Sequence, residues 1–219
     1  MDLIEIIKQR KSIRHFSPEQ PSREVLHECL EAAAWAPNPT TQQPWQFIVL
    51  TGDTLKEVVA VIEKNFSLAQ QKKNQEPLPP ISAETRSLLE ERKSRSFQEM
   101  VSFLKDKAVD MQAVGRGNFC FHHAPVGIIF ATYLWKDQNF YKSTVAALEN
   151  FLIAATAKGL GTCWMNAVSI CQEYIKEALK LPQELIFIDG VAVGYPVDDS
   201  PLNQIPRSRL PVHEVTLWL

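Results

Sequence analysis

The chain has 219 residues, of which 45% are hydrophobic and 22% are charged, and its formal net charge is −2. This balance is typical of one globular domain, with or without a long arm, and it excludes a disordered chain. Because the net charge is close to zero, the chain has no overall positive field to attract nucleic acid or an anionic membrane surface.

Two helices and a loop are predicted near the N-terminus. A capping box at Asp2 and Glu5 starts a short apolar helix that ends close to a basic cluster. Ser22 caps a second helix, whose apolar residues recur every three or four positions until Pro37 stops it. A loop is expected between Pro37 and Pro44.

A buried strand and a long polar region follow. Residues 46–51 (QFIVLT) have the β-branched and aromatic content of a strand, and TLKE at 54–57 indicates the capping box of another helix. The polar, proline-containing stretch 67–82 predicts an exposed loop or mobile arm. Residues 82–113 are strongly charged but carry apolar side chains at helical spacing, which predicts one or two amphipathic helices.

A second strand and an apolar helix are predicted in the middle of the chain. Residues 126–133 (VGIIFATY) have the composition of a buried strand. A helix over roughly 143–158 is apolar nearly all round, which implies that both of its sides are buried. Gly159 and Gly161 end this helix.

The C-terminal part contains one more helix and one more strand. After a short extended piece at 164–165, a capping box at Ser169 and Gln172 is expected to start a helix near 171–181. The apolar segment 185–196 (LIFIDGVAVGYP) indicates a third strand. The final residues, VHEVTLWL, alternate in part, but no hairpin turn pairs them with their neighbour, so they are expected to pair elsewhere, with another subunit as one option.

Three cations and a serine lie close together in RKSIRHF, at residues 10–16. In an extended segment Arg10, Ser12 and Arg14 point to the same side, and guanidinium forks with a hydroxyl suit the oxygens of a phosphate. Arg207 and Arg209 repeat this spacing around a serine near the other end of the chain. Two such pairs are suited to clamp one phosphate, although a short basic cluster more often only neutralises a solvated surface.

Two further segments have the composition of a binding site for a planar ligand. APNPTTQQPW at 36–45 combines rigid prolines with short polar and amide side chains, which suit the edge of a flat heterocycle but also an ordinary loop before a strand. GLGTCWMN at 159–166 has two glycines, which allow close backbone approach, before a turn whose amides can donate to a ligand. The pattern G-x-G-x-x-G is absent, so no dinucleotide-binding fingerprint is predicted.

Metal binding and catalysis by side chains are not indicated. The four cysteines show no C-x-x-C spacing, so reduced and mostly buried thiols are expected. His122 and His123 would face opposite ways in a strand and cannot share a metal, and Cys163 is explained as a small packing residue. No apolar run is long enough for a signal peptide or a membrane span, so we expect a cytoplasmic protein without a membrane partner.

Together and in this order, these segments resemble the FMN-dependent nitroreductase family over most of the chain. The family motif R-R-S-x-R-x-F is matched by residues 10–16, with Lys11 in place of the second arginine. The family loop A-P-S-x-x-N-x-Q-P-W is matched by residues 36–45, with Asn38 in place of serine and Thr41 in place of asparagine. A helix ending in A-x-x-x-G-L-G-T-C-W, the segment DGVAVGYP and a late R-S-R-L-P also match.

The resemblance implies an α+β, nitroreductase-like fold, with a central, mainly antiparallel sheet flanked by helices in an intertwined homodimer. It implies a single domain over residues 1–219, with a variable helical or loop insertion at about 67–115 and an extended C-terminal arm at about 206–219. One FMN would lie at each of two subunit interfaces, with its phosphate on the basic residues and the loop at 36–45 coming from the partner chain. The residues implied to bind FMN are Arg10, Lys11, Ser12, Arg14, Pro37, Asn38, Pro39, Thr40, Gln43, Trp164, Met165, Asn166, Arg207 and Arg209, with Arg116 and Asn118 as further candidates for the flavin ring.

The function that the resemblance implies is a ping-pong oxidoreductase. FMN would take a hydride at N5 from NADH or NADPH and pass electrons to an electron-poor small molecule such as a nitroaromatic compound or a quinone, so that no catalytic side chain is needed. Two alternatives stay open: a flavin-binding or redox-sensing module without turnover, and a specialised branch such as a reductive dehalogenase or a flavin-cleaving enzyme. The segment 67–105 is expected to set the choice of acceptor.

Overall fold

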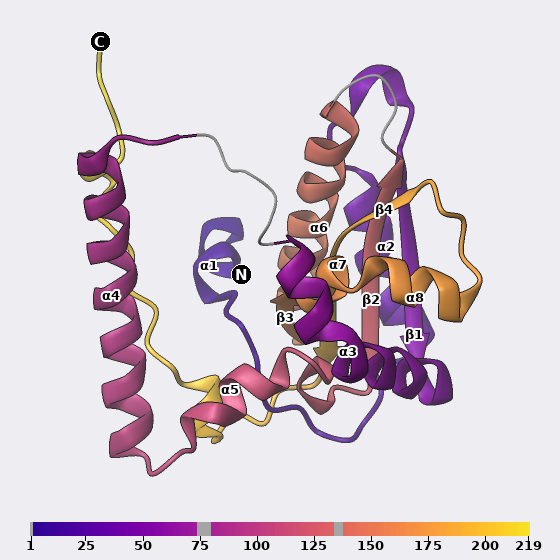
Figure 1. Ribbon diagram of the computed structural model, residues 1–219, viewed down its shortest axis with the longest axis horizontal. Coiled ribbons are helices and arrows are strands. Elements are labelled where there is room, and N and C mark those ends of the chain that lie inside the picture. Colours follow the sequence, from indigo (N-terminus) through magenta and orange to yellow (C-terminus); the bar gives the residue numbers. More distant parts are fainter. Residues whose placement is uncertain (1, 74–79, 134–137) are drawn as a thin grey trace.

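A four-stranded antiparallel sheet forms the centre of the molecule. The computed structural model describes residues 2–73, 80–133 and 138–219. The strands lie in the order β1 (Trp45–Thr51), β2 (Val126–Tyr133), β4 (Leu185–Gly194) and β3 (Gly161–Met165), as Figure 1 shows. The predicted antiparallel sheet is therefore confirmed, and the short extended piece expected near residue 164 is a full strand at the sheet edge.

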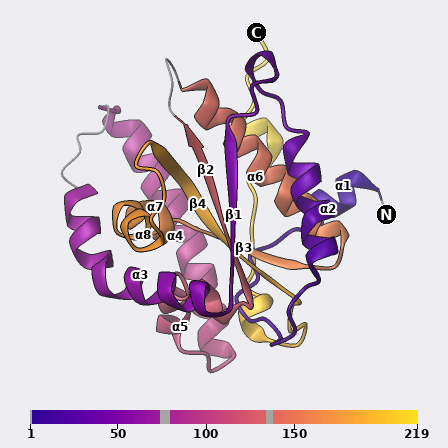
Figure 2. The same cartoon turned by 90° about the vertical axis from the view of Figure 1, so that its right-hand side faces the viewer.

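Helices cover both faces of this sheet. On one face lie α2 (Arg23–Ala34) and α6 (Asn139–Ala157), and on the other lie α3 (Gly52–Lys73), α7 (Ala167–Ile170) and α8 (Gln172–Leu179), as Figure 2 shows. The other helical elements are α1 (Leu3–Gln9), α4 (Ala83–Asp106), α5 (Met111–Gly117) and short 3-10 turns at Pro39–Thr41, Phe121–His123, Pro201–Asn203 and Val212–Glu214.

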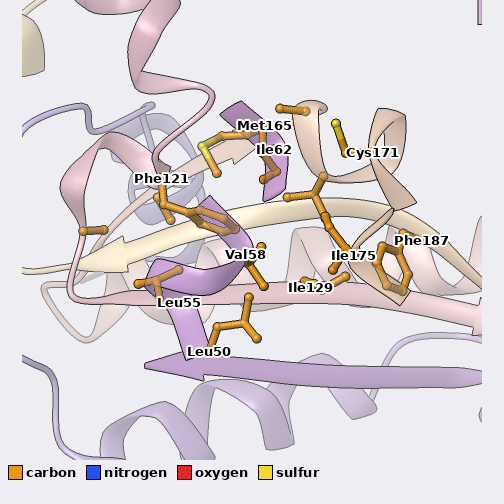
Figure 3. Close-up of a cluster of buried hydrophobic side chains, with 14 of the residues drawn as sticks. Leu50, Leu55, Val58, Ile62, Phe121, Ile129, Met165, Cys171, Ile175 and Phe187 are labelled. Carbon is orange, nitrogen blue, oxygen red and sulfur yellow. The ribbon is translucent and has the colours of Figure 1, made fainter. Parts of the chain in front are cut away.

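Each face of the sheet has its own hydrophobic core. Along β2, Ile129 packs with the α3, α7 and α8 side, whereas Ile128 and Phe130 pack with the α2 and α6 side. This two-sided burial explains why VGIIFATY is almost continuously apolar. Figure 3 shows the first of these cores, in which Phe121 and Phe187 approach the side chains of α3 and α8.

Ser22 is the one predicted helix cap that the structure confirms, because its hydroxyl accepts a hydrogen bond from Val25 N at 3.3 Å. Asp2 precedes α1 as predicted, but its side chain makes no capping hydrogen bond. The capping box at 54–57 is wrong, since α3 already begins at Gly52. The box at Ser169 and Gln172 is also wrong, because the Ser169 hydroxyl bonds to a strand carboxylate instead.

The prediction of a loop from residue 67 is wrong for its first part. Helix α3 continues to Lys73. Ala69 follows Ile62 and Phe66 on the same side of this helix and is buried in the core. The apolar spacing of three and four residues therefore outweighs the polar composition of this stretch. Residues 74–79 of the predicted loop lie outside the described part of the chain.

A helix is confirmed in the predicted range 82–113 as α4, and α5 begins at the end of that range and continues to Gly117. Helix α4 stands apart from the sheet in Figure 1, and Leu104 is its only fully buried side chain. The C-terminal segment runs beside it, where Ser208 Oγ donates to Glu99 Oε2 at 2.8 Å. The segment forms no strand in this chain, and the turn at Val212–Glu214 interrupts the alternating pattern. Within the described ranges, no helix combines the length and apolar character needed to cross a membrane.

Candidate functional site

The basic motif near the N-terminus lies along the outer edge of β3. Ile13 N donates to Thr162 O at 2.8 Å, and Ser12 forms an isolated parallel bridge with Thr162. The Ile13 side chain is buried against Gly161, where an added Cβ would lie 2.8 Å from it. Because side chains alternate along an extended segment, Ser12 and Arg14 point away from this core. Gly161 thus leaves the space that the buried Ile13 side chain of the motif occupies.

Asn203 fixes the backbone of the motif from the C-terminal side of the chain. Its side chain is almost fully buried, and its Oδ1 accepts from Arg14 N at 2.7 Å and His15 N at 3.0 Å. Its Nδ2 donates to His15 O at 2.7 Å and to Val197 O at 2.9 Å. An asparagine in PLNQ has no distinguishing signal, so this role of Asn203 could not be predicted from the sequence. Its four hydrogen bonds set the position from which Arg14 extends.

The two basic pairs meet in the folded chain. The Arg207 guanidinium donates to the carbonyl oxygens of Arg10 and Lys8, and also to Gln9 O at 3.3 Å. Partial burial, together with the positive charges of Arg10 and Arg209, lowers the pKa of Arg207. We call Arg10, Arg207 and Arg209 the arginine cluster. Three guanidinium groups that repel one another at the same place favour the binding of an anion.

Two cavities meet at the arginine cluster. One, of about 700 Å³, is lined by Arg10, Lys11 and Arg207 together with the glycine turn before β3. The other, of about 420 Å³, is lined by Arg10, Arg207, Arg209 and Lys8, with Glu149 as its one acidic residue. A phosphate group fits this donor set, because planar guanidinium forks bind its oxygens in pairs.

Arg14 and Ser12 face a different part of the site from the arginine cluster, and neither lines the two cavities. Arg14 Nη1 donates to Ser12 O at 3.3 Å, and the charge of Arg14 acts on His122 and Cys163. Burial raises the pKa of the Cys163 thiol, although Arg14, the Ser12 hydroxyl and Arg10 oppose the rise. Cys163 is therefore a buried thiol and not a thiolate, as the sequence indicated.

The loop at 36–45 lies at the other end of the sheet. Trp45, at the end of the loop, pairs with Thr132 of β2. Ser12 lies beside Thr162 of β3, and Thr162 is connected through Val193 of β4 to Val126, at the other end of β2. Along β2 this separation is roughly 20 Å. The end of the loop at Trp45 and the bridge at Ser12 therefore lie toward opposite ends of the sheet.

The loop is held in an unusual backbone conformation. Asn38 Oδ1 accepts from Gln43 N at 2.8 Å, and Asn38 Nδ2 donates to Ala36 O at 3.2 Å. Thr40 and Gln43 have positive φ values of 46° and 47°, which non-glycine residues rarely adopt. Asn38, which departs from the family motif, thus closes the loop on itself and leaves the side chains of Thr40 and Gln43 exposed.

A carboxylate organises the turn that follows β3. Asp189 accepts from Trp164 Nε1 at 2.6 Å and from Ser169 Oγ at 2.5 Å, which joins the strand before the turn to the helix after it. Met165 is buried and Asn166 is exposed between these two anchors. Such short bonds to a carboxylate are strong and rigid. The segment DGVAVGYP predicts the strand, but it gives no hint that its aspartate supports this turn.

Arg116 and Asn118, which were candidates for contacts to the flavin ring, make hydrogen bonds to nearby residues of their own segment. Arg116 pairs with Asp110 at 2.7 Å and donates to Gln112 Oε1 at 2.9 Å. Asn118 Nδ2 donates to Val114 O at 3.4 Å. Both side chains thus satisfy their own helix, and nothing in the described residues brings either one to the arginine cluster.

His122 is a buried, neutral histidine. Phe121–His123 form a 3-10 turn, in which His122 is buried and His123 is exposed. Within the described residues His122 Nε2 has no hydrogen-bond partner, and the ring lies so close to Gly117 that a Cβ there would be 2.0 Å from Nδ1. Burial, with smaller contributions from Arg14 and His123, lowers the pKa of His122 to about 4.

We expect the stability of the protein to fall at acidic pH because of His122. The ordinary pKa of 6.5 applies to the unfolded chain, which therefore takes up a proton before the folded chain does. The neutral His122 thus contributes about 3 kcal/mol to the free energy of unfolding above pH 6.5, and this stabilisation is lost as the pH falls toward 4. Urea unfolding of wild type and His122→Leu, at several pH values, measures it. Wild type should lose more stability than the variant, and equal losses would contradict this assignment.

The comparisons with known proteins point to one family. Residues 7–195 match the model of the Nitroreductase family. The chain is 26% identical to nitrobenzene nitroreductase from Ectopseudomonas oleovorans, over 98% of this chain and 96% of that protein. It is 25% identical to 4-nitrobenzoate reductase from Pseudomonas putida, over 95% and 91%. Its fold is similar to the crystal structure of the FMN-dependent nitroreductase NfnB from Mycobacterium smegmatis in complex with NADPH, with a TM-score of 0.81, 18% identity and complete coverage of both chains. Because the family match covers most of its length, the chain belongs to the nitroreductase family.

Proposed function

We propose that this chain is an FMN-dependent oxidoreductase that transfers a hydride from NADH or NADPH to an electron-poor acceptor, such as a nitroaromatic compound or a quinone. The observation that carries this proposal is the arginine cluster, in which opposite ends of the chain present guanidinium groups to one place. Family membership and the relatives named as nitroreductases support the same activity. When bound, FMN supplies the chemistry of the hydride transfer.

The residues of this chain would hold the two ends of FMN. Arg10, Arg207 and Arg209 would bind the phosphate, with Lys11 at the rim of the larger cavity. Ser12 lines neither cavity and would contact FMN from the same side as Arg14. Arg14 lies toward β3 and would place its positive charge nearer the ring. The turn at Trp164, Met165 and Asn166 would direct backbone amides to the N5 edge, since β3 is an edge strand. Amides aimed at that edge would stabilise negative charge that develops there.

We propose that the active form is a homodimer with two such sites. Because the loop at 36–45 and the N-terminal motif lie toward opposite ends of the sheet, the loop residues Pro37, Asn38, Pro39, Thr40 and Gln43 would act in the site of the partner chain. Large apolar side chains are exposed on α1, on α4 and on the C-terminal segment, where Leu217 and Trp218 are about 90% exposed. Exposed apolar surface of this extent is typical of a face that another chain covers.

We expect the double variant Leu217→Ser, Trp218→Ser to weaken the dimer. Because a two-fold interface contains each residue twice, losing this apolar burial should raise the dimer dissociation constant by roughly a thousandfold. Sedimentation velocity over a concentration series measures the change. The matched control is Leu68→Ser, which makes the same leucine-to-serine substitution at an exposed position of α3. A wild-type protein that stays monomeric at high concentration would contradict the proposed assembly.

Anaerobic addition of NADH and NADPH tests the proposed activity. If the chain is an enzyme, either or both nucleotides will bleach the flavin absorbance quickly, and nitrobenzene will then restore it. A flavin that neither nucleotide reduces would favour a binding or sensing module, and a reduced flavin that no nitro compound or quinone reoxidises would favour a specialised branch of the family.

A further inference from the structure

Strand β4 contains a bulge beside the turn that follows β3. Along the ladder with β2, Phe187 and Asp189 pair with adjacent residues, so Ile188 is an extra residue of β4. Ile188 packs into the core on the α2 and α6 side, whereas Asp189 is only half-buried. Asp189 lies one residue before Gly190, which pairs with Met165 at the end of β3. A bulge re-aims a neighbouring side chain, and this one brings a carboxylate to the point where β3 leaves the sheet.

Two adjacent residues of β4 fix the turn. The two carboxylate oxygens of Asp189 each accept one hydrogen bond, from Trp164 Nε1 at 2.6 Å and from Ser169 Oγ at 2.5 Å. The next residue, Gly190, leaves space for Val168, since a Cβ on Gly190 would lie 2.4 Å from Val168 Cγ2. Val168 is fully buried there. The turn is therefore attached to β4 both by hydrogen bonds and by packing.

The turn depends on these contacts because it has little structure of its own. Helix α7 contains four residues, and a single helical turn is unstable without tertiary contacts. Asn166, which precedes this helix, is exposed, and its side chain makes no capping hydrogen bond. Trp164 and Ser169 lie on either side of the backbone at Met165 and Asn166. Asp189 thus spans this backbone, and one carboxylate sets its position.

We propose that Asp189 is a positioning residue of the flavin site, which holds the backbone amides of the turn in line with the N5 edge of FMN. This inference rests on the proposed function, in which Met165 and Asn166 present those amides. Asp189 acts through Trp164 and Ser169 and does not itself touch the cofactor. Donors that are fixed in advance need no reorganisation when negative charge develops beside them, whereas a loose turn has to be ordered in every catalytic cycle.

The decisive variants are Asp189→Ala and Ser169→Ala, compared by rapid anaerobic mixing of the FMN-loaded protein with NADH or NADPH. Asp189→Ala should lower the limiting rate of flavin reduction roughly thirtyfold and Ser169→Ala roughly fivefold, because the donors are less well aligned. The double variant should be no slower than Asp189→Ala, since both changes remove the same hydrogen bond. Asp189→Asn keeps one oxygen as an acceptor and should recover part of the rate.

The binding of FMN separates positioning from a general loss of structure. The dissociation constant for FMN should change by less than about threefold in each variant, because the arginine cluster is intact. The matched control is Asp53→Ala, which removes an exposed aspartate that pairs with Lys56 at 2.8 Å on the surface of α3. This control should leave both the reduction rate and FMN binding unchanged.

A measurement without turnover separates this inference from the proposed function. In FMN that is isotopically labelled at N5, the nitrogen NMR shift reports the hydrogen bond to that atom, and it should move in Asp189→Ala and Ser169→Ala but not in Asp53→Ala. An unchanged shift in Asp189→Ala would overturn the inference, as would a loss of FMN binding as large as the loss of rate. If neither nucleotide reduces the wild-type flavin, the proposed function fails, and the N5 shift still decides the role of Asp189.

Discussion

Replacing Arg207 by alanine should weaken FMN binding by roughly a hundredfold, because each charge-assisted hydrogen bond to a phosphate is strong. The substitution also removes the bonds from the guanidinium to the carbonyl oxygens of Lys8, Gln9 and Arg10, which place Arg10 beside it. One change therefore affects two of the three members of the arginine cluster. Titration of the flavin-free protein with FMN, followed by flavin fluorescence, measures the dissociation constant.

Two further variants show whether the guanidinium fork itself matters. Arg207→Lys keeps the charge but loses the planar fork, so it should weaken FMN binding by roughly tenfold. Arg23→Ala, which removes an exposed arginine from the first turn of α2, should have no effect. If Arg207→Ala binds FMN as tightly as Arg23→Ala does, the arginine cluster is not the phosphate site.

Replacing Asn203 by alanine should lower the free energy of unfolding by about 3 kcal/mol, since four hydrogen bonds of one buried side chain are lost. The N–H groups of Arg14 and His15 would lose their acceptor, and the carbonyl groups of His15 and Val197 their donor. Because this backbone positions Arg14, FMN binding should weaken as well. Urea unfolding of the flavin-free protein measures the stability.

The neighbouring residue provides the matched control for Asn203. Gln204 is exposed and makes one hydrogen bond, to Asp198 O at 3.3 Å, so Gln204→Ala should change the stability by less than about 0.5 kcal/mol. Similar losses in the two variants would show that the Asn203 bonds do not hold the N-terminal motif in place.

The sheet and most helices were predictable because their physical signals are local. The continuous apolar run of β2 follows from burial on both faces, and Ser22 is followed at once by an amphipathic helix. The two basic segments were visible for a similar reason, since arginines around a serine occur near both ends of the chain, and their binding of a phosphate stays a prediction. What the sequence could not show is that Arg207 would bond directly to the backbone at Arg10.

The missed features depend on contacts between distant parts of the chain. Asn203 and Asp189 are ordinary polar residues in the sequence, and only the fold brings them to the N-terminal motif and to the turn after β3. Helix α3 extends past residue 67 because Ala69 packs on the core, which a polar composition conceals.

The absorbance spectrum of the purified protein, after incubation with FMN and removal of the free cofactor, tests the central claim most directly. We predict a retained flavin spectrum with about one FMN per chain, in a particle with the mass of a dimer. A chain that folds, gives the far-UV spectrum of this α+β structure and yet retains no FMN would contradict the account.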